Sequence, residues 1–345
     1  MANAANWIPA FKYGHKLYPQ NIVDAGVPVE GGNVLFVDGD KSTGGAGRTW
    51  EDAYATIQAA VDGASAGDVI YIAAKTITAL ATDPVSYAET VIIPNDKPQL
   101  SLIGISRGRT QGGLPQIKMG SGSTAMLTVR APGCLIANLG FNGIRSVGST
   151  QSLVGVLLDD DGGATSAAFG TSILGCHFKN CAGSNSSTDA GVGGAITWSS
   201  DGGAWQILIA GNRFYKNVGD IVLPATALSV PQDVVIEDNI FSGPAANVDS
   251  NLFLKGGGSG INGLIIRDNV FCAKPALGTV AKYMDLTGCV GIMCHNYFAS
   301  LLSNTSSEGT FAAAGSLAFV PTTVYMAGNE GETHITTELG HVFRT

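Results

Sequence analysis

Four stretches of the chain repeat one pattern without gaps, and they decide the fold. They read ILIAGNRF (207–214), VVIEDNIF (234–241), LIIRDNVF (264–271) and GIMCHNYF (291–298). Each has an aliphatic run or a near equivalent, followed by Asn, one further residue and Phe. The asparagines are Asn212, Asn239, Asn269 and Asn296, spaced 27, 30 and 27 residues apart. A fixed period of this length predicts a repeat architecture.

Weaker copies and a second series of apolar runs complete each period. The copies are LIANLGF (135–141), ILGCHF (173–178) and VYMAGN (324–329), of which the last lacks the Phe. The second series comprises 153–158, 195–198, 221–223, 252–254, 283–286 and 316–320. Clusters of Gly, Asn, Ser and Pro separate the runs, so each period holds at least two short strands joined by turns.

This period is too short for a helical crossover and fits a solenoid in which each strand pairs with its equivalent one coil away. Parallel strands stacked in this way lie about 4.8 Å apart, so the asparagines form a ladder and the phenylalanines an interior column. Glu237 and Arg267 hold the same place in successive copies and should be favourable cross-strand neighbours. The alternative is a β-sandwich whose copies are alike by chance.

Residues 33–109 carry a different pattern that includes one amphipathic segment. A helix is predicted over 49–62, with Thr49 and Asp52 as a variant capping box and Gly63 near its end. An uncovered end of a β-solenoid exposes strand edges and core. We therefore expect this helix to cap the first coil.

The N-terminal motifs resemble the opening of a known superfamily. They read FVDGD (36–40), TWEDAYATIQAAVDGASAGDVIYIA (49–73), YAETVIIP (87–94) and LSLIGI (100–105). This sequence is similar to right-handed parallel β-helix proteins of the pectate-lyase-like superfamily, over roughly residues 33–329 with the later copies included. The resemblance implies an all-β fold, a single-stranded right-handed parallel β-helix with an N-terminal capping α-helix. It indicates no single activity, because the superfamily includes lyases, hydrolases, epimerases, adhesins and phage tailspikes.

Composition excludes several classes of protein. Glycine accounts for 47 of 345 residues, whereas it makes up roughly 7% of an average chain. Charged residues account for 13%, against roughly 25% in an average chain. The glycines follow no strict three-residue period and no long apolar stretch occurs, which argues against collagen and a membrane span. The net charge of −8 and the lack of a basic run argue against nucleic acid as a partner. Six cysteines without a CxxC motif predict no obligatory disulfide.

Acidic residues follow the second series of strands, and they are the weak candidates for catalysis. In the resembling enzymes, sugars lie along the outer face of one strand stack, which this series should form. A glycosidase needs two carboxyls about 5 to 10 Å apart, and Asp160 with Asp201 on the next coil is the candidate pair. The alternative is that the run 159–161 is a solvated turn or a casual cation site.

Four further residues are candidates for binding glycan rather than cleaving it. They are Asp159, Asp161, Trp198 and Trp205, which offer hydrogen-bonding groups and flat apolar surfaces. Trp198 has two alternatives, a place in the core or a subunit contact.

The chain departs from the catalytic patterns of the resembling enzymes. Polygalacturonases carry a His between two glycines and an Arg-Ile-Lys element, whereas His177 and His295 lie in CHF and CHN, and residues 266–268 read IRD. The second strand series offers only Lys255 as a lyase base, without an acidic ladder beside it. The two Cys-His pairs are four coils apart, about 19 Å, so we expect no metal site and no cofactor.

The two ends of the chain lie outside the repeat. Residues 1–32 carry Trp7, Phe11, Tyr13 and Tyr18 and read as an extended docking arm, because exposed aromatics favour a partner surface. Residues 330–345 should cover the last coil. The N-terminus lacks the features of a signal peptide, so we expect a soluble protein made without a secretion signal.

These features together resemble phage virion proteins such as tailspikes, fibres and capsid-surface spikes. The resemblance implies a structural, non-enzymatic virion protein, assembled in the host cytoplasm as a homotrimer. Its partners would be other virion proteins through the arm, and host polysaccharide. The alternative is a polysaccharide-degrading glycoside hydrolase, and a third hypothesis is a carbohydrate-binding module.

Overall fold

The computed structural model describes most of the repeat. The described residues are 32–76, 85–105, 113–118, 125–143, 154–160, 168–181, 194–199, 204–217, 219–224, 230–242, 250–255, 260–272, 282–298 and 318–331. The predicted docking arm with Trp7, Phe11, Tyr13 and Tyr18, and the segment 332–345, lie outside these residues.

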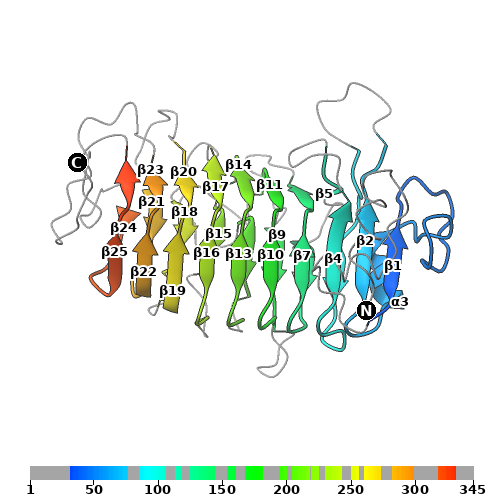
Figure 1. The fold of residues 1–345 in the computed structure, drawn as a ribbon, viewed down its shortest axis with the longest axis horizontal. Coiled ribbons are helices and arrows are strands. Elements are labelled where there is room, and N and C mark those ends of the chain that lie inside the picture. Colours follow the sequence, from blue (N-terminus) through cyan, green and yellow to red (C-terminus); the bar gives the residue numbers. More distant parts are fainter. Residues whose placement is uncertain are drawn as a thin grey trace, which may run out of the picture.

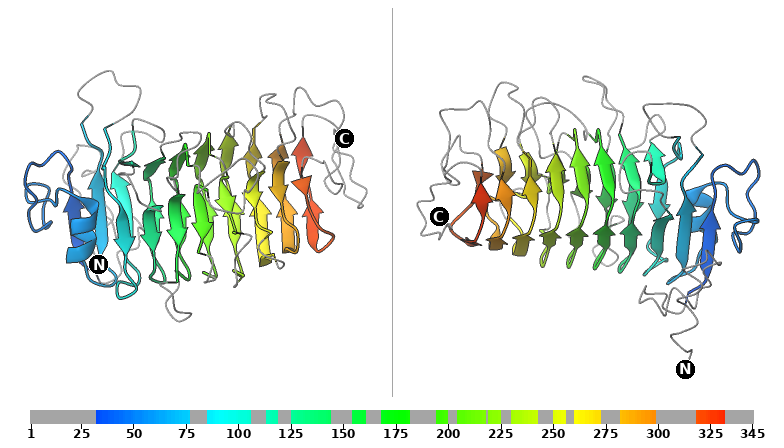
Figure 2. Two further views of the ribbon diagram at one scale, coloured as in Figure 1. Left: turned by 180° about the vertical axis from the view of Figure 1, so that it is seen from behind. Right: turned by 45° about the horizontal axis from the view of Figure 1, so that its top comes forward.

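Three parallel sheets wind around one core, and every pair of neighbouring strands is parallel (Figures 1 and 2). Sheet A contains β1 (Val34–Val37), β2 (Val69–Ala73), β4 (Ser101–Ile105), β7 (Leu135–Ala137), β10 (Ser172–Leu174), β13 (Leu208–Ala210), β16 (Val235–Glu237), β19 (Asn262–Arg267), β22 (Val290–Cys294) and β25 (Val324–Ala327). Sheet B contains β5 (Gln116–Lys118), β8 (Gly140–Asn142), β11 (His177–Lys179), β14 (Arg213–Tyr215), β17 (Ile240–Ser242), β20 (Val270–Phe271), β23 (Tyr297–Phe298) and β26 (Glu330–Gly331). Sheet C contains β3 (Val91–Ile93), β6 (Ala125–Val129), β9 (Val154–Leu158), β12 (Ile196–Trp198), β15 (Ile221–Val222), β18 (Ser250–Phe253), β21 (Lys282–Asp285) and β24 (Ala318–Phe319). The predicted right-handed parallel β-helix is confirmed.

Each full coil has three strands, one from each sheet. The repeated motif is not one strand, because it turns a corner at its Asn. In the first full copy β13 ends at Ala210, Gly211 takes the left-handed region with φ of 66°, and β14 begins after Asn212. Gly suits this position because a positive φ costs it little. Figure 1 shows the colours advancing along the long axis, as expected when successive coils stack.

The asparagines form the predicted ladder at this corner. The backbone N–H of Asn212 donates to Asn239 Oδ1 at 2.9 Å, and that of Asn239 to Asn269 Oδ1 at 3.0 Å. The ladder continues through Asn296 to Asn329. Each side chain also donates to a carbonyl of the previous coil, as Asn269 Nδ2 does to Ile236 O at 2.9 Å. The ladder thus satisfies backbone groups that sheet pairing cannot reach at a corner.

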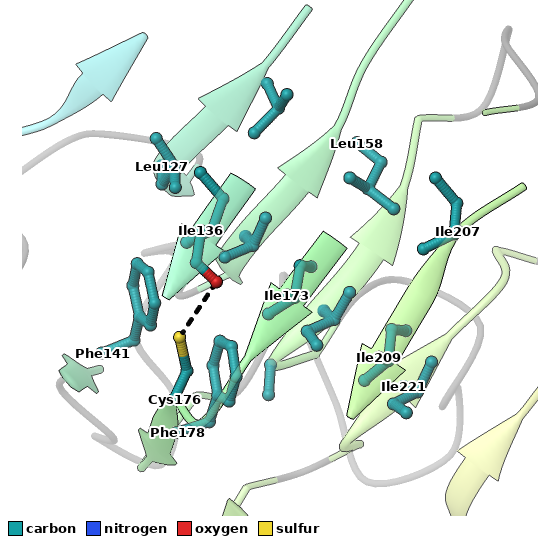
Figure 3. Close-up of a cluster of buried hydrophobic side chains, with 14 of the residues drawn as sticks. Leu127, Ile136, Phe141, Leu158, Ile173, Cys176, Phe178, Ile207, Ile209 and Ile221 are labelled. Carbon is teal, nitrogen blue, oxygen red and sulfur yellow. Dashed lines mark hydrogen bonds between the residues drawn. The ribbon is translucent and has the colours of Figure 1, made fainter. Parts of the chain in front are cut away.

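The phenylalanines form the predicted interior column. Its members are Phe141, Phe178, Phe214, Phe241, Phe271 and Phe298, with successive ring centroids 4.7 to 5.1 Å apart and nearly parallel planes. Figure 3 shows the first two rings beside Cys176, whose thiol contacts Ile136 O at 3.7 Å. All six cysteines are free, and four are buried as small apolar groups.

The helix near the N-terminus begins later than the sequence predicts. It is α3 (Ile57–Gly63), capped by Thr56, whose hydroxyl accepts from Ala59 N at 3.2 Å. Thr49 does bind Asp52 N, but the two lie in a turn. The helix cannot start there because Tyr54 pairs with β1 instead, its N–H donating to Phe36 O. Ile57, Ala60 and Val61 are buried, and the helix lies at the β1 end of the solenoid (Figure 2).

The predicted pairing of Glu237 with Arg267, which tests the register of the strands, is confirmed. Glu237 on β16 pairs with Arg267 on β19 in the sheet, and Arg267 Nε donates to Glu237 Oε2 at 2.6 Å. None of the helices in the described part of the chain is long and apolar enough to cross a membrane.

Candidate functional site

The candidate site lies where three successive strands of sheet C end. Val129 on β6, Leu158 on β9 and Trp198 on β12 are aligned across the sheet. The pairing continues one residue further, since Asp159 N donates to Val129 O and Ser199 N to Leu158 O, both at 2.8 Å. Parallel pairing therefore places polar residues of three coils side by side. We call Arg130, Asp159, Asp160 and Ser199 the sheet C ends.

Asp159, a predicted glycan-binding residue, is held by an ion pair. Arg130 Nε donates to its Oδ2 at 2.9 Å, and the side chains are 33% and 15% exposed. The sheet pairing fixes the spacing of the two backbones, so the pair presents a guanidinium and a carboxylate at a defined place on the surface.

Asp160, one member of the predicted catalytic pair, is buried, with 4% of its surface exposed. Ser199 Oγ on the next coil donates to Asp160 Oδ1 at 3.4 Å. Asp201, its proposed partner, and Asp161 lie outside the described residues. The structure thus places Asp160 beside the coil that leads to Asp201.

Trp198 belongs to the core, which corrects its prediction as a surface for sugars. It is 1% exposed because β12 turns Ile196 and Trp198 inward, and Trp198 lies beside Leu158 of the previous coil. Its indole Nε1 donates to Ala204 O at 3.1 Å. The side chain therefore ties the end of β12 to the residue that precedes Trp205.

Trp205 keeps the exposed surface that the prediction requires. It is 44% exposed, and its ring packs against Phe169 with centroids 5.4 Å apart. The two aromatics occupy equivalent places in neighbouring coils, because Gly170 N donates to Trp205 O. Together they form an aromatic pair at the corner between sheets C and A, on the coils that carry Asp160 and Ser199.

The rest of the outer face of sheet C is largely hydroxyl or apolar where it is described. Thr128 and Thr197 are nearly covered, and Thr197 Oγ1 donates to Val222 O at 3.0 Å. Asp285 accepts from both the N–H and the hydroxyl of Thr287. The described polar groups of this face are thus covered or engaged in the protein's own hydrogen bonds.

Sequence reasoning missed Arg130 and Phe169. A signal for both was present, since counting back from the aliphatic triplets aligns Phe169 with Trp205, and continuing the second strand series aligns Arg130 with Asp159. Finding them requires the register of three coils at once. Among the described residues, no three His, Cys, Asp or Glu side chains gather in a way that could hold a metal ion.

Comparison with known proteins gives likeness in structure only. No protein-family profile and no curated protein matches the chain by sequence. An alginate lyase from Paenibacillus sp. str. FPU-7 is similar with a TM-score of 0.58 and 16% identity, covering 90% of this chain and 99% of that one. The GH136 lacto-N-biosidase from Eubacterium ramulus has a TM-score of 0.54 and 11% identity, covering 95% of this chain and 64% of that one. A pectin methylesterase from Aspergillus niger has a TM-score of 0.48 and 14% identity over 92% of both chains. At these identities the likeness to the alginate lyase and the lacto-N-biosidase supports one conclusion, that this chain shares their fold, which the sheets described above identify as a parallel β-helix.

Proposed function

We propose that the protein is a structural or adhesive component of a phage particle that contacts host-surface glycan at the sheet C ends without cleaving it. The observation that carries the proposal is that both described aspartates there are engaged in the protein's own contacts. Asp159 is paired with Arg130, and Asp160 is buried against Ser199. A hydrolase needs one protonated and one ionised carboxyl directed at the substrate.

Binding without cleavage requires polar groups and an apolar surface, and neighbouring coils of this part of the solenoid carry both. Arg130 and Asp159 supply donors and acceptors for sugar hydroxyls, and the exposed ring of Trp205 offers a flat surface. Aromatic side chains bury large areas and lose little conformational entropy on binding. The Trp205 and Phe169 pair is therefore the main contact that we propose for the glycan.

Trp50 offers a matched control for a binding experiment. It is 38% exposed and packs on Phe36 at the same interplanar angle of 55° that Trp205 makes with Phe169. Host capsule or exopolysaccharide should bind the full chain, and Trp205→Ala should abolish most of the binding while Trp50→Ala retains it. Equal binding by all three proteins would contradict the proposal.

The place of the protein in a particle is a separate part of the proposal. The aromatic arm would dock the protein as a homotrimer onto other virion proteins, in keeping with the sequence resemblance. Deletion of residues 1–31 should leave a folded solenoid that no longer joins the particle. Unchanged incorporation would rule out docking through the arm.

A second candidate is a polysaccharide hydrolase that uses Asp160 and Asp201. It is favoured by the contact between Asp160 and Ser199, because Asp201 follows Ser199 by two residues. Release of reducing ends from host polysaccharide, abolished by Asp160→Asn or Asp201→Asn, would establish this candidate and overturn the first. Asp285→Asn, on the same sheet but bound to Thr287, should leave such activity unchanged.

A further inference from the structure

The outer face of sheet A is apolar over its last six strands, and the proposed function gives it no role. Ile236 and its equivalents point into the core, so the residues on either side of them point outward. These outward residues form two columns across β10, β13, β16, β19, β22 and β25, which Figure 1 shows in this order. The first column reads Ser172, Leu208, Val235, Ile265, Ile292 and Tyr325, and the second reads Leu174, Ala210, Glu237, Arg267, Cys294 and Ala327.

Large apolar side chains on this face are open to solvent. Ile292 and Val290 on β22 are each 45% exposed. Tyr325 on β25 is 66% exposed, more than any other large apolar side chain in the part of the chain that the structure describes. Apolar side chains gathered on one face are typical of a surface that another molecule covers, whereas isolated ones are ordinary.

Glu237 and Arg267 are the only charged residues on these six strands, whose residues are all described. They lie on the two middle strands, and Arg267 Nη2 is 2.6 Å from Glu237 Oε2. The face is therefore neutral in a chain whose net charge is −8. Copies of such a chain repel each other through their net charge, and a neutral face keeps that repulsion small where they meet.

The order of the strands allows this face to pack against itself. Two sheets pack face to face about 10 Å apart. A two-fold axis that lies between two such copies, parallel to the strands and midway between β16 and β19, reverses the order of the strands. It places β16 opposite β19, β13 opposite β22 and β10 opposite β25 of the second copy. The two columns stay in register, because the rotation leaves positions along the strands unchanged.

The side chains that meet in this arrangement complement each other in size. Three pairs combine a larger with a smaller side chain, and two combine aliphatic side chains. The first three are Tyr325 with Ser172, Leu174 with Ala327, and Cys294 with Ala210, and the other two are Leu208 with Ile292 and Val235 with Ile265. Each pair occurs twice, since a two-fold contact uses the same patch on both copies.

The charges select this register. Glu237 of each copy lies opposite Arg267 of the other, so the two pairs form one cluster of alternating charge. An axis on β16 would place Glu237 opposite its own equivalent, and an axis on β19 would do the same for Arg267. Like charges that meet across an interface are unfavourable, whereas unlike charges fix its register.

We propose that two copies of this chain associate through the outer face of sheet A, about a two-fold axis between β16 and β19. The contact covers the exposed side chains of Ile292 and Tyr325 and pairs the charges across the interface. It leaves the sheet C ends free, so it does not depend on the glycan contact proposed above. Because it joins two copies, it is an alternative to the homotrimer.

The first test measures the mass of the full chain by sedimentation over a range of concentrations. We expect the mass of two chains at the higher concentrations. Ile292→Lys should weaken the association on the order of a hundredfold, because each dimer would bury two ammonium groups without partners.

Ile92→Lys is the matched control, because Ile92 is an exposed isoleucine on the outer face of sheet C. It should associate as the unchanged chain does. The mass of one chain at every concentration, the mass of three chains, or equal weakening by both substitutions would overturn the proposal.

The charge pair supplies a second test that does not depend on Ile292. Glu237→Arg gives a chain with two arginines at these positions, and Arg267→Glu gives one with two glutamates. Each variant alone should be monomeric, and an equal mixture should form a heterodimer, because every arginine then faces a glutamate of the other chain. Mixing restores no ion pair within a chain, so native mass spectrometry of the mixture reports the contact between chains. A mixture that stays monomeric would contradict the proposed register and the contact with it.

Discussion

Two columns of sheet B differ by one residue in sequence and follow opposite rules. The inner column repeats Phe from Phe141 to Phe298, whereas the outer column one residue earlier reads Gly140, His177, Arg213, Ile240, Val270 and Tyr297. Inside, each ring must stack on its equivalent at the spacing of the strands, so one residue type serves every coil. Outside, nothing constrains successive coils to agree. Repetition therefore marks residues that hold the fold, and variation marks residues that can differ from coil to coil without loss of the stack.

The largest effect should come from the inner column itself. Phe241→Ala removes a ring stacked on both sides and should lower the free energy of unfolding by about 4 kcal/mol. Ile240→Ala, its outward neighbour, should cost less than about 1 kcal/mol. Chemical denaturation of both variants measures the difference, and similar losses would refute the distinction between the columns.

The Asn ladder should show the next largest effect. Asn269→Ala leaves the buried N–H of Asn239 without its acceptor and removes the hydrogen bond from the side chain to Ile236 O, at a cost of about 3 kcal/mol. Asp268→Asn changes the adjacent residue of the same turn, where Asn also tolerates the positive φ. The control variant should unfold at the denaturant concentration of the unchanged chain. A comparable loss in both would mean that the turn, and not the ladder, carries the stability.

The outer column should respond to pH through His177. Its pKa is lowered from 6.5 to about 4 in the folded chain, so between these values the unfolded chain takes up a proton that the folded chain does not. Stability is therefore retained above about pH 6.5 and falls as the pH is lowered, by about 2 kcal/mol at pH 4 after screening by partial hydration of the ring.

Unfolding curves between pH 7 and 4 check this prediction. His177→Gln should remove most of the slope, and His295→Gln, whose side chain is 67% exposed, should keep it. Parallel slopes in His177→Gln and the unchanged chain would show that other groups cause the acid sensitivity.

The smallest effect should come from the ion pair at the sheet C ends. A double-mutant cycle with Arg130→Gln and Asp159→Asn should give a coupling of about 0.5 kcal/mol, because the pair is partly exposed. A coupling several times larger would mean that this ion pair, like the Asn ladder and the Phe column, holds the fold.

Much of the fold follows from the repeat, and less of the site does. The spacing of Asn212, Asn239 and Asn269 predicts the stack of coils, and the pairing of Glu237 with Arg267 confirms its register. The start of α3 was predicted too early, because Tyr54 is drawn into pairing with β1. Local pattern does not reveal such competition from a distant strand.

Periodic sequence thus suffices for the interior of this protein, because identical residues in successive coils meet at one strand spacing. It predicts the parallel stacking of the coils, the ladder and the column, and it offers Asp160 and Trp205 as candidate site residues. It does not reveal that the motif turns a corner at its Asn or that Trp198 faces the core, and it brings Arg130 to Asp159 only when the register of three coils is known. Those features depend on the winding of three sheets, which sets the direction of each side chain and brings residues about 30 positions apart into contact.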